Sequence, residues 1–273
     1  MVRIARTVAL APVPRPWFVD ALGAVTDLAE STTAEDGRVL LPDGRQAPEL
    51  RLAEGRHLRP GAVYESTEEA DAGKGTDTVR ITVEEWRRTH ALRVAFSGSG
   101  SDGDLTGRAA LFGPDRPDRV ELSGRAALTG VWSPLSRFDV DAELRCGDWW
   151  QTADGGGGVR RPPLRARLTC GVARAELTAV PRPGPGHGDW EVTVAVRVRG
   201  RGLLRPLVSL GLALARRPLT RAVAEAVDDA ARDWNAQVPQ LTALGPEELR
   251  QKLLTEPWCL MPRARPAGPA IGP

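Results

Sequence analysis

The sequence predicts an α+β protein in which a curved antiparallel sheet is covered by a long C-terminal helix. Residues 88–199 contain a series of short segments in which apolar and polar side chains alternate, as in strands that bury one face. Segments rich in Gly, Pro and Asp separate them, as expected for an antiparallel meander. Residues 203–234 instead carry apolar side chains every three to five positions, which is typical of an amphipathic helix.

The N-terminal part adds further elements. Residues 3–11 (RIARTVALA) alternate and predict a strand, and residues 14–30 show helical spacing with a proline near the start. Residues 31–78 are rich in turn signals, including Asp43-Gly44, and are interpreted as an insertion. We therefore expect one domain over residues 1–240, followed by a short helix and a proline-rich tail at 241–273.

Alternation assigns the apolar side chains of the meander to a single inner face, which is expected to be buried. Many positions on this face carry only Gly or Ala, namely 107, 109, 124, 126, 142, 166, 175 and 179. Small side chains leave volume that a helix or a bound ligand can fill. The alternative is that the glycines serve only the curvature of the sheet.

Composition excludes several classes of function. The net charge is +2, and the arginines alternate with Asp and Glu along the strands, which argues against a nucleic-acid surface. Only two lysines occur, a skew that indicates a GC-rich genome such as an actinobacterial one. The longest apolar run is interrupted by Arg205 and Pro206 and falls short of the roughly 20 residues of a membrane span. Three cysteines without CxxC spacing, and no secretory signal, favour free thiols in the cytoplasm.

Motifs for metals, cofactors and covalent catalysis are not found. The sequence has no P-loop, GxSxG, HExxH or dinucleotide fingerprint. The three histidines, His57, His90 and His187, are scattered and do not predict a metal site. We expect a site that uses neither a metal nor a cofactor.

His90 and Asp148 are the candidate catalytic residues. His90 shares the inward phase of a strand predicted over residues 88–96, and Asp148 follows an oppositely directed strand, so both are expected at the same end of the sheet. The C-terminal helix is expected to start at that end too, if residues 164–180 form a single strand with a bulge at Gly171. A histidine beside a carboxylate can exchange a proton near neutral pH. The alternative is that His90 is a structural residue at the rim and that Asp148 caps a turn. The candidate substrate-binding residues around this pair are Trp86, Tyr64, Phe96, Trp149, Trp150 and Trp190.

The order of these elements resembles the helix-grip superfamily, which includes START-type lipid-transfer domains and bacterial polyketide aromatases and cyclases. The segment VRVRGRGLLRPLVSLGLALARRPLTRAVAEAVDDAARDWN, residues 196–235, looks like the strand-to-helix closure of that superfamily. The chain is longer than such a domain, because residues 31–87 and the tail are additional. A lipocalin-like β-barrel therefore stays open as an alternative fold.

The resemblance implies a function in secondary metabolism. We expect the chain to bind a hydrophobic small molecule, polyketide or lipid-like, in an internal pocket. We also expect it to catalyse a cofactor-independent cyclisation, dehydration or isomerisation, with His90 and Asp148 moving protons. The alternatives are a non-catalytic carrier, whose pocket is lined only by apolar groups, and an interaction protein with no pocket and an exposed apolar patch along Leu203–Leu214.

Overall fold

The structure is a computed structural model that describes residues 1–69, 76–101, 103–130, 136–157, 160–186, 188–201, 211 and 215–255. Most of the segment 203–214, His187 and the tail after residue 255 lie outside the described residues. The structure therefore does not test the predictions about the first half of the C-terminal helix and about the tail.

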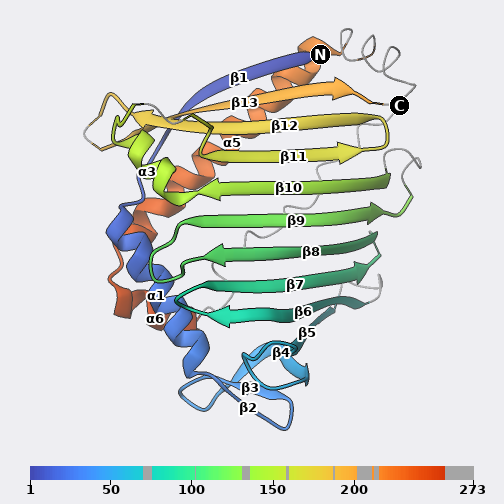
Figure 1. Ribbon diagram of the computed structural model, residues 1–273, viewed down its shortest axis with the longest axis vertical. Helices are drawn as coiled ribbons and strands as arrows, with labels where there is room; N and C mark the ends of the chain where they lie inside the picture. Colours follow the sequence, from blue (N-terminus) through green and yellow to red (C-terminus); the bar gives the residue numbers. More distant parts are fainter. Residues whose placement is uncertain are drawn as a thin grey trace.

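A single antiparallel sheet of 13 strands dominates the described structure (Figure 1). Its order is β1-β13-β12-β11-β10-β9-β8-β7-β6-β5-β4-β3-β2. Consecutive strands from β2 to β13 therefore pair with each other, and β1 pairs with β13. The strands are β1 (Val2–Leu10), β2 (Thr33–Glu35), β3 (Arg38–Leu40), β4 (Gln46–Glu54), β5 (Val63–Glu69), β6 (Thr76–Arg87), β7 (Ala91–Gly100), β8 (Gly103–Phe112), β9 (Arg119–Leu128), β10 (Arg137–Arg145), β11 (Leu164–Cys170), β12 (Ala173–Pro183) and β13 (Trp190–Gly200).

The register confirms that the alternating apolar positions share one face. Phe96 pairs with Gly107, which pairs with Gly124, and Gly124 pairs with Val140 in the next strand. This row continues through Leu168 in β11. Parallel rows on either side of it carry Leu105 and Leu122 on the same face, because residues two apart along a strand point the same way. We call this surface the apolar face and the opposite one the charged face.

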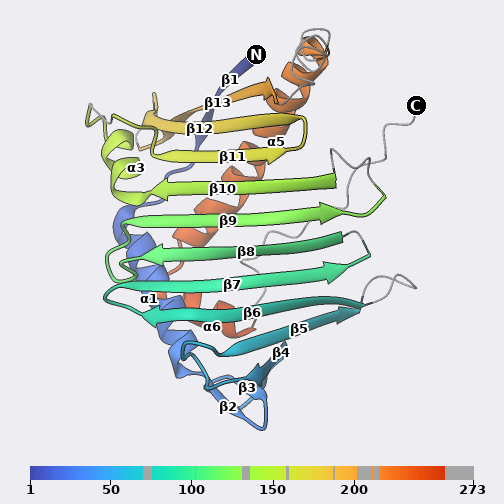
Figure 2. The same ribbon diagram turned by 45° about the vertical axis from the view of Figure 1, so that its right-hand side comes forward.

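Four helices accompany the sheet: α1 (Arg15–Ser31), α3 (Cys146–Ala153), α5 (Arg216–Thr242) and α6 (Pro246–Thr255). Pro16 lies in the first turn of α1, where a missing N–H is tolerated. Helix α1 packs against α6, α3 packs mainly against β12, and α5 packs against β1. Figures 1 and 2 both show α1, α5 and α6 behind the sheet and α3 at the end where β10 stops.

The predicted fold class is wrong. A helix-grip sheet wraps around its C-terminal helix, whereas this sheet is open and its described C-terminal helix contacts the edge strand β1. The lipocalin-like alternative also requires a closed sheet, but the edge strands β1 and β2 do not pair with each other. Residues 33–69, expected as part of an insertion, form strands β2 to β5 and extend the same sheet.

The C-terminal helix was predicted to start at the wrong end of the sheet, because one turn was not recognised. The expectation that the helix starts beside His90 required residues 164–180 to be a single bulged strand. The chain turns at Gly171 and Val172, so that β11 and β12 are two strands. The additional reversal places the end of β13 at the side of the sheet opposite His90 (Figure 1).

Side chains are buried in two separate clusters. The first cluster joins Val39, Ala47, Ala62, Tyr64 and Val83, near β3 to β6. The second joins Ala153, Ala179, Trp190 and Val192, near α3, β12 and β13. Between them the apolar face was expected to be buried, but several of its large side chains are exposed: Val79, Leu105, Leu122, Leu128 and Leu168. The described helices therefore cover the ends of this face (Figure 1), and side chains at its centre stay exposed.

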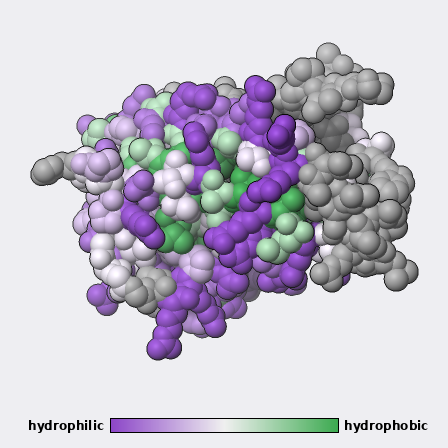
Figure 3. Space-filling view, turned by 90° about the horizontal axis from the view of Figure 1, so that it is seen from above, coloured by the Kyte–Doolittle hydropathy of each residue, from purple (hydrophilic) through white to green (hydrophobic). Residues whose placement is uncertain are grey.

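Helix α5 covers the outer edge of β1, where backbone groups would otherwise stay unpaired. Arg6 forms an ion pair with Asp228 at 2.8 Å, and the indole Nε1 of Trp234 donates to the carbonyl oxygen of Ala11 at 2.8 Å. Seen from above, this side of the molecule shows hydrophobic side chains surrounded by hydrophilic ones (Figure 3). None of the helices in the described part of the chain is long and apolar enough to cross a membrane.

Candidate functional site

The structure does not bring His90 and Asp148 together. His90 lies in the turn between β6 and β7 rather than in a strand, so the alternation of a strand does not determine its direction. Asp148 lies in the first turn of α3, where its carboxylate pairs with Arg145 at 2.6 Å. Both residues are at the same end of the sheet, as expected. However, β7 and β10 are three strand steps apart, which is about 14 Å.

His90 has a different carboxylate partner, Glu85, which the sequence reading missed. The Nδ1 atom of His90 lies 2.7 Å from Oε1 of Glu85. Arg87 donates to the same oxygen at 2.6 Å, and Arg93 lies 3.4 Å from the other one. The hydrogen bond from Arg87 is the main cause that lowers the pKa of Glu85, with a smaller contribution from His90. A register shift between Val83 and Glu85 turns this carboxylate onto the charged face, and no periodic pattern reveals such a shift.

The predicted aromatic residues are divided between the two buried clusters. Trp149 packs edge-on against Trp190 with ring centroids 5.8 Å apart, and Trp150 donates to the carbonyl oxygen of Val13 at 2.9 Å. Trp86 packs against the first cluster and donates to Glu30 at 3.0 Å. These contacts use the indole N–H groups and the ring faces within the fold, so the tryptophans do not form one pocket mouth.

Tyr64 belongs to a hydrogen-bonded chain that includes His57 and Thr32. The hydroxyl of Tyr64 lies 2.8 Å from Nδ1 of His57, and Nε2 of His57 lies 2.9 Å from the hydroxyl of Thr32. The backbone N–H of Leu58 donates to the Tyr64 hydroxyl at 2.9 Å. Burial lowers the pKa of His57 and raises the pKa of Tyr64. Because each of these polar groups has a partner, the chain fastens the end of α1 to the loop before β5.

Phe96 is the one predicted binding residue at the centre of the apolar face. A methyl group at Gly107 would lie 2.4 Å from Cζ of Phe96, so the ring lies directly over this glycine. At the neighbouring Gly124 only backbone atoms come within 4 Å of such a methyl group. Leu105 and Leu122, in the same two strands, are 46% and 41% exposed. We call the centre of the apolar face, around Gly107 and Gly124, the apolar floor, and its leucines are accessible.

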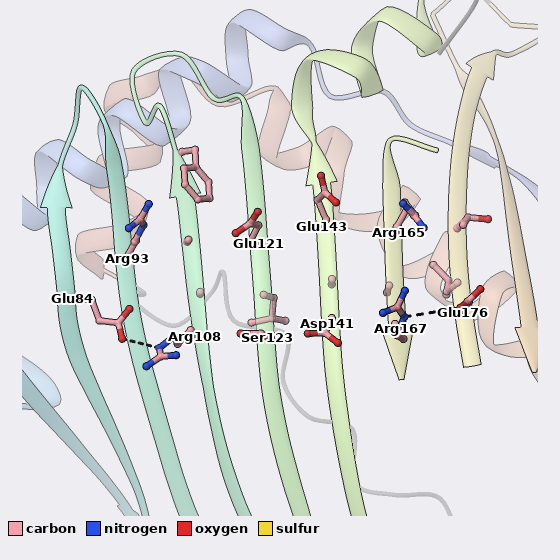
Figure 4. A pocket seen from close by; sticks show the side chains of 18 residues that line it. Glu84, Arg93, Arg108, Glu121, Ser123, Asp141, Glu143, Arg165, Arg167 and Glu176 are labelled. Atoms are coloured by element: carbon pink, nitrogen blue, oxygen red, sulfur yellow. Dashed lines mark hydrogen bonds and ion pairs between the residues drawn. The ribbon is translucent and has the colours of Figure 1, made fainter. Parts of the chain in front are cut away.

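A hollow of about 660 Å³ lies on the charged face, across β6 to β12 (Figure 4). Its walls are long charged side chains, including Arg93, Arg108, Glu121, Glu143 and Arg165. Figure 4 shows that Arg108 reaches Glu84 and that Arg167 reaches Glu176, at 2.8 Å and 4.0 Å. The predicted pocket was internal and apolar, whereas this hollow is open and charged.

Metal-binding geometry is not found in the described part of the chain. No group of three or more His, Cys, Asp or Glu side chains is arranged there to hold an ion. His187, one of the three histidines, lies outside that part. The thiols of Cys146 and Cys170 are free.

Comparisons with known proteins leave the family of this chain undefined. No family model matches it, and no curated protein matches it. Among solved structures, it is similar to the crystal structure of DynU16, a protein in the dynemicin biosynthetic locus. The identity is 18% and the TM-score 0.19, over 82% of this chain and 94% of that chain. A TM-score of this size carries no weight for the fold or the function of this chain.

Proposed function

We propose that this chain binds a hydrophobic small molecule, polyketide or lipid-like, on the open centre of its apolar face. The observation that carries the proposal is the exposure of Leu105, Leu122 and Leu168 in central strands of the sheet, where the flanking clusters on both sides are buried. Exposed apolar side chains that gather on one face of a folded protein often mark a binding surface.

The size of this area favours a small ligand over a protein partner. Strands β7 to β11 span four steps of about 4.8 Å, or about 19 Å. The six steps from Leu105 to Leu111 span about 20 Å, since each residue of an antiparallel strand rises about 3.4 Å. This part of the sheet therefore measures roughly 400 Å², which is about half of the area that each partner contributes to a standard protein interface.

The shape of the floor suits an extended or flat molecule. Gly107 and Gly124 are register partners at its centre, and Ala109 and Ala126 lie beside them in the same strands. Phe96 provides an aromatic ring over Gly107, and among the described residues only backbone atoms come within 4 Å of a methyl group placed at Gly124. Burying a ligand against the three exposed leucines contributes about 25 cal/mol for each Å² of apolar surface removed from water.

The same surface favours binding without chemistry. Among the described inward positions of β7 to β11, the only titratable side chain is Cys170. The histidine-carboxylate pair of the described residues, His90 and Glu85, lies elsewhere: His90 is in a turn, and Glu85 is on the charged face. The apolar face therefore supports a non-catalytic carrier better than an enzyme that transfers protons to its ligand.

Binding of a fluorescent fatty acid to the full chain tests the proposal. Leu105→Gln and Leu122→Gln keep the size of the side chain but add a polar group to the floor, so each should weaken binding by about tenfold. Both side chains are over 40% exposed, so neither change should unfold the protein. Thr106→Gln and Ser123→Gln are the matched controls, because they alter the adjacent residues on the opposite face.

The outcome separates the candidate occupants of this face. Loss of fluorescence binding in the two leucine variants, with both controls unchanged, supports the proposal. Equal binding in all five proteins contradicts it. A wild-type chain that ignores the fatty acid but forms a concentration-dependent dimer, lost in Leu122→Gln, would show that a second copy covers the face instead.

A further inference from the structure

We infer that the hollow on the charged face is a second binding site, which takes a small zwitterion such as a short peptide. It lies on the opposite side of the sheet from the apolar floor and is independent of the function proposed above. Two carboxylates of β10, Asp141 and Glu143, and two guanidinium groups of β11, Arg165 and Arg167, line its middle.

These four residues are paired in the strand register but do not form ion pairs with each other. Asp141 is the register partner of Arg167, and Glu143 is the register partner of Arg165. Opposite charges in such positions have Cβ atoms about 5 Å apart and normally attract each other. Within the described residues, Asp141 and Arg165 make no ion pair or hydrogen bond. Glu143 lies 3.9 Å from Arg145, and Arg167 lies 4.0 Å from Glu176.

A comparable pair just outside the hollow behaves differently. Arg125 of β9 and Asp139 of β10 are also register partners, and their charged groups meet at 2.9 Å. Both side chains are more than half exposed, so solvent alone does not keep opposite charges apart on this face. Both open pairs line the hollow of about 660 Å³, in which Arg167 does lie within 4.0 Å of Glu176, its register partner on the other side.

The arrangement of charges defines the ligand. Two carboxylates along one strand accept hydrogen bonds from an ammonium group, and two guanidinium groups along the next strand donate to a carboxylate. The strands are about 4.8 Å apart. The charged ends of an extended dipeptide are about 6 Å apart, because its Cα atoms are separated by 3.80 Å and the terminal N and C atoms extend beyond them. A dipeptide can therefore place one charged end over each strand, whereas the ends of free glycine, about 2.5 Å apart, are closer together than the two strands.

Titration of the full chain with glycylglycine at low salt tests this site, with NMR or calorimetry as the readout. Glycine and acetate serve as comparison ligands. We expect glycylglycine to bind with a dissociation constant on the order of millimolar, and both comparison ligands to bind at least about tenfold more weakly. Asp141→Asn and Arg165→Gln should each weaken glycylglycine binding by about tenfold, since each removes one charge from the site. Neither residue has a partner within the described structure, so both variants should fold normally.

Asp139→Asn and Arg125→Gln are the matched controls, because they remove charges from the same face outside the hollow. Unchanged binding in these controls, together with the losses above, supports the site. The inference is overturned if the dissociation constant of glycylglycine is above about 100 mM. It is equally overturned if acetate binds as well as the dipeptide, or if the controls weaken binding as much as Asp141→Asn does.

Discussion

Asn235 of helix α5 makes two hydrogen bonds with the backbone at the end of β1. Its Oδ1 accepts from the N–H of Ala11 at 2.7 Å, and its Nδ2 donates to the carbonyl oxygen of Ala9 at 2.9 Å. Because β1 is the edge of the sheet, these backbone groups have no neighbouring strand on that side. One side chain thus joins the first strand to a helix more than 200 residues later and closes an edge that could otherwise pair with another chain.

Replacing Asn235 should therefore destabilise the protein. Asn235→Ala removes both hydrogen bonds and leaves two backbone groups unpaired, which should lower the free energy of unfolding by about 1–3 kcal/mol. Urea denaturation followed by circular dichroism measures the change. Gln237→Ala, at an exposed position of the same helix, is the control and should change the stability by less than about 0.5 kcal/mol. Equal losses of unfolding free energy in the two variants would mean that the contact of Asn235 with β1 does not stabilise the protein.

Stability should fall as His57 becomes protonated. Burial lowers the pKa of His57 below its ordinary value of 6.5, so the unfolded chain binds this proton more readily than the folded one. The free energy of unfolding should therefore decrease as the pH drops below 6.5 and should be insensitive to His57 well above it. His57→Gln removes this titration. Urea midpoints measured across this pH range should decline less steeply in the variant, and identical slopes would contradict the prediction.

Replacement by alanine should have opposite effects on stability at Gly107 and at Gly23. Gly107→Ala would place Cβ 2.6 Å from the carbonyl oxygen of Ser123 and even closer to Phe96. Overpacking of this kind should cost about 1–3 kcal/mol of folding free energy. Gly23→Ala, inside α1 with no atom within 4 Å of the new methyl group, should stabilise the protein by about 1 kcal/mol. Thermal unfolding of both variants provides the comparison, and a neutral Gly107→Ala would show that Phe96 and β9 give way at little cost.

Cys146 should be unreactive in the folded protein. Its side chain is fully buried, and burial, reinforced by the charge of Asp118, raises the pKa of its thiol to about 11. Only about a thousandth of this group is thiolate at pH 8, and the thiolate is the reactive form. Iodoacetamide labelling followed by mass spectrometry should modify the partly exposed Cys170 in the native chain and Cys146 only after denaturation in urea. Labelling of both thiols at the same rate in the native chain would refute the expected burial.

Sequence periodicity was reliable for single strands. The alternation of Phe138, Val140, Ala142 and Leu144 predicted which side chains share a face, and the register with β11 confirms it. The face of His90 could not be predicted in this way, because the residue lies in a turn, where alternation does not apply. The partnership of His90 with Glu85 depends on a register shift in β6, which has no counterpart in the pattern of apolar residues.

The sequence by itself determined the alternation of the central strands β7 to β10, their apolar and charged faces and the small residues at 107 and 124, because these properties depend only on neighbours along the chain. Only the tertiary structure decided that β1 pairs with β13, that α5 lies along the edge, and that Leu105, Leu122 and Leu168 at the centre of the apolar face stay exposed. The cause is physical: a helix with an apolar stripe can pack equally well against the middle or the edge of a sheet. Contacts such as those of Asn235 and Asp228 with β1 select the edge, and they join residues more than 200 positions apart.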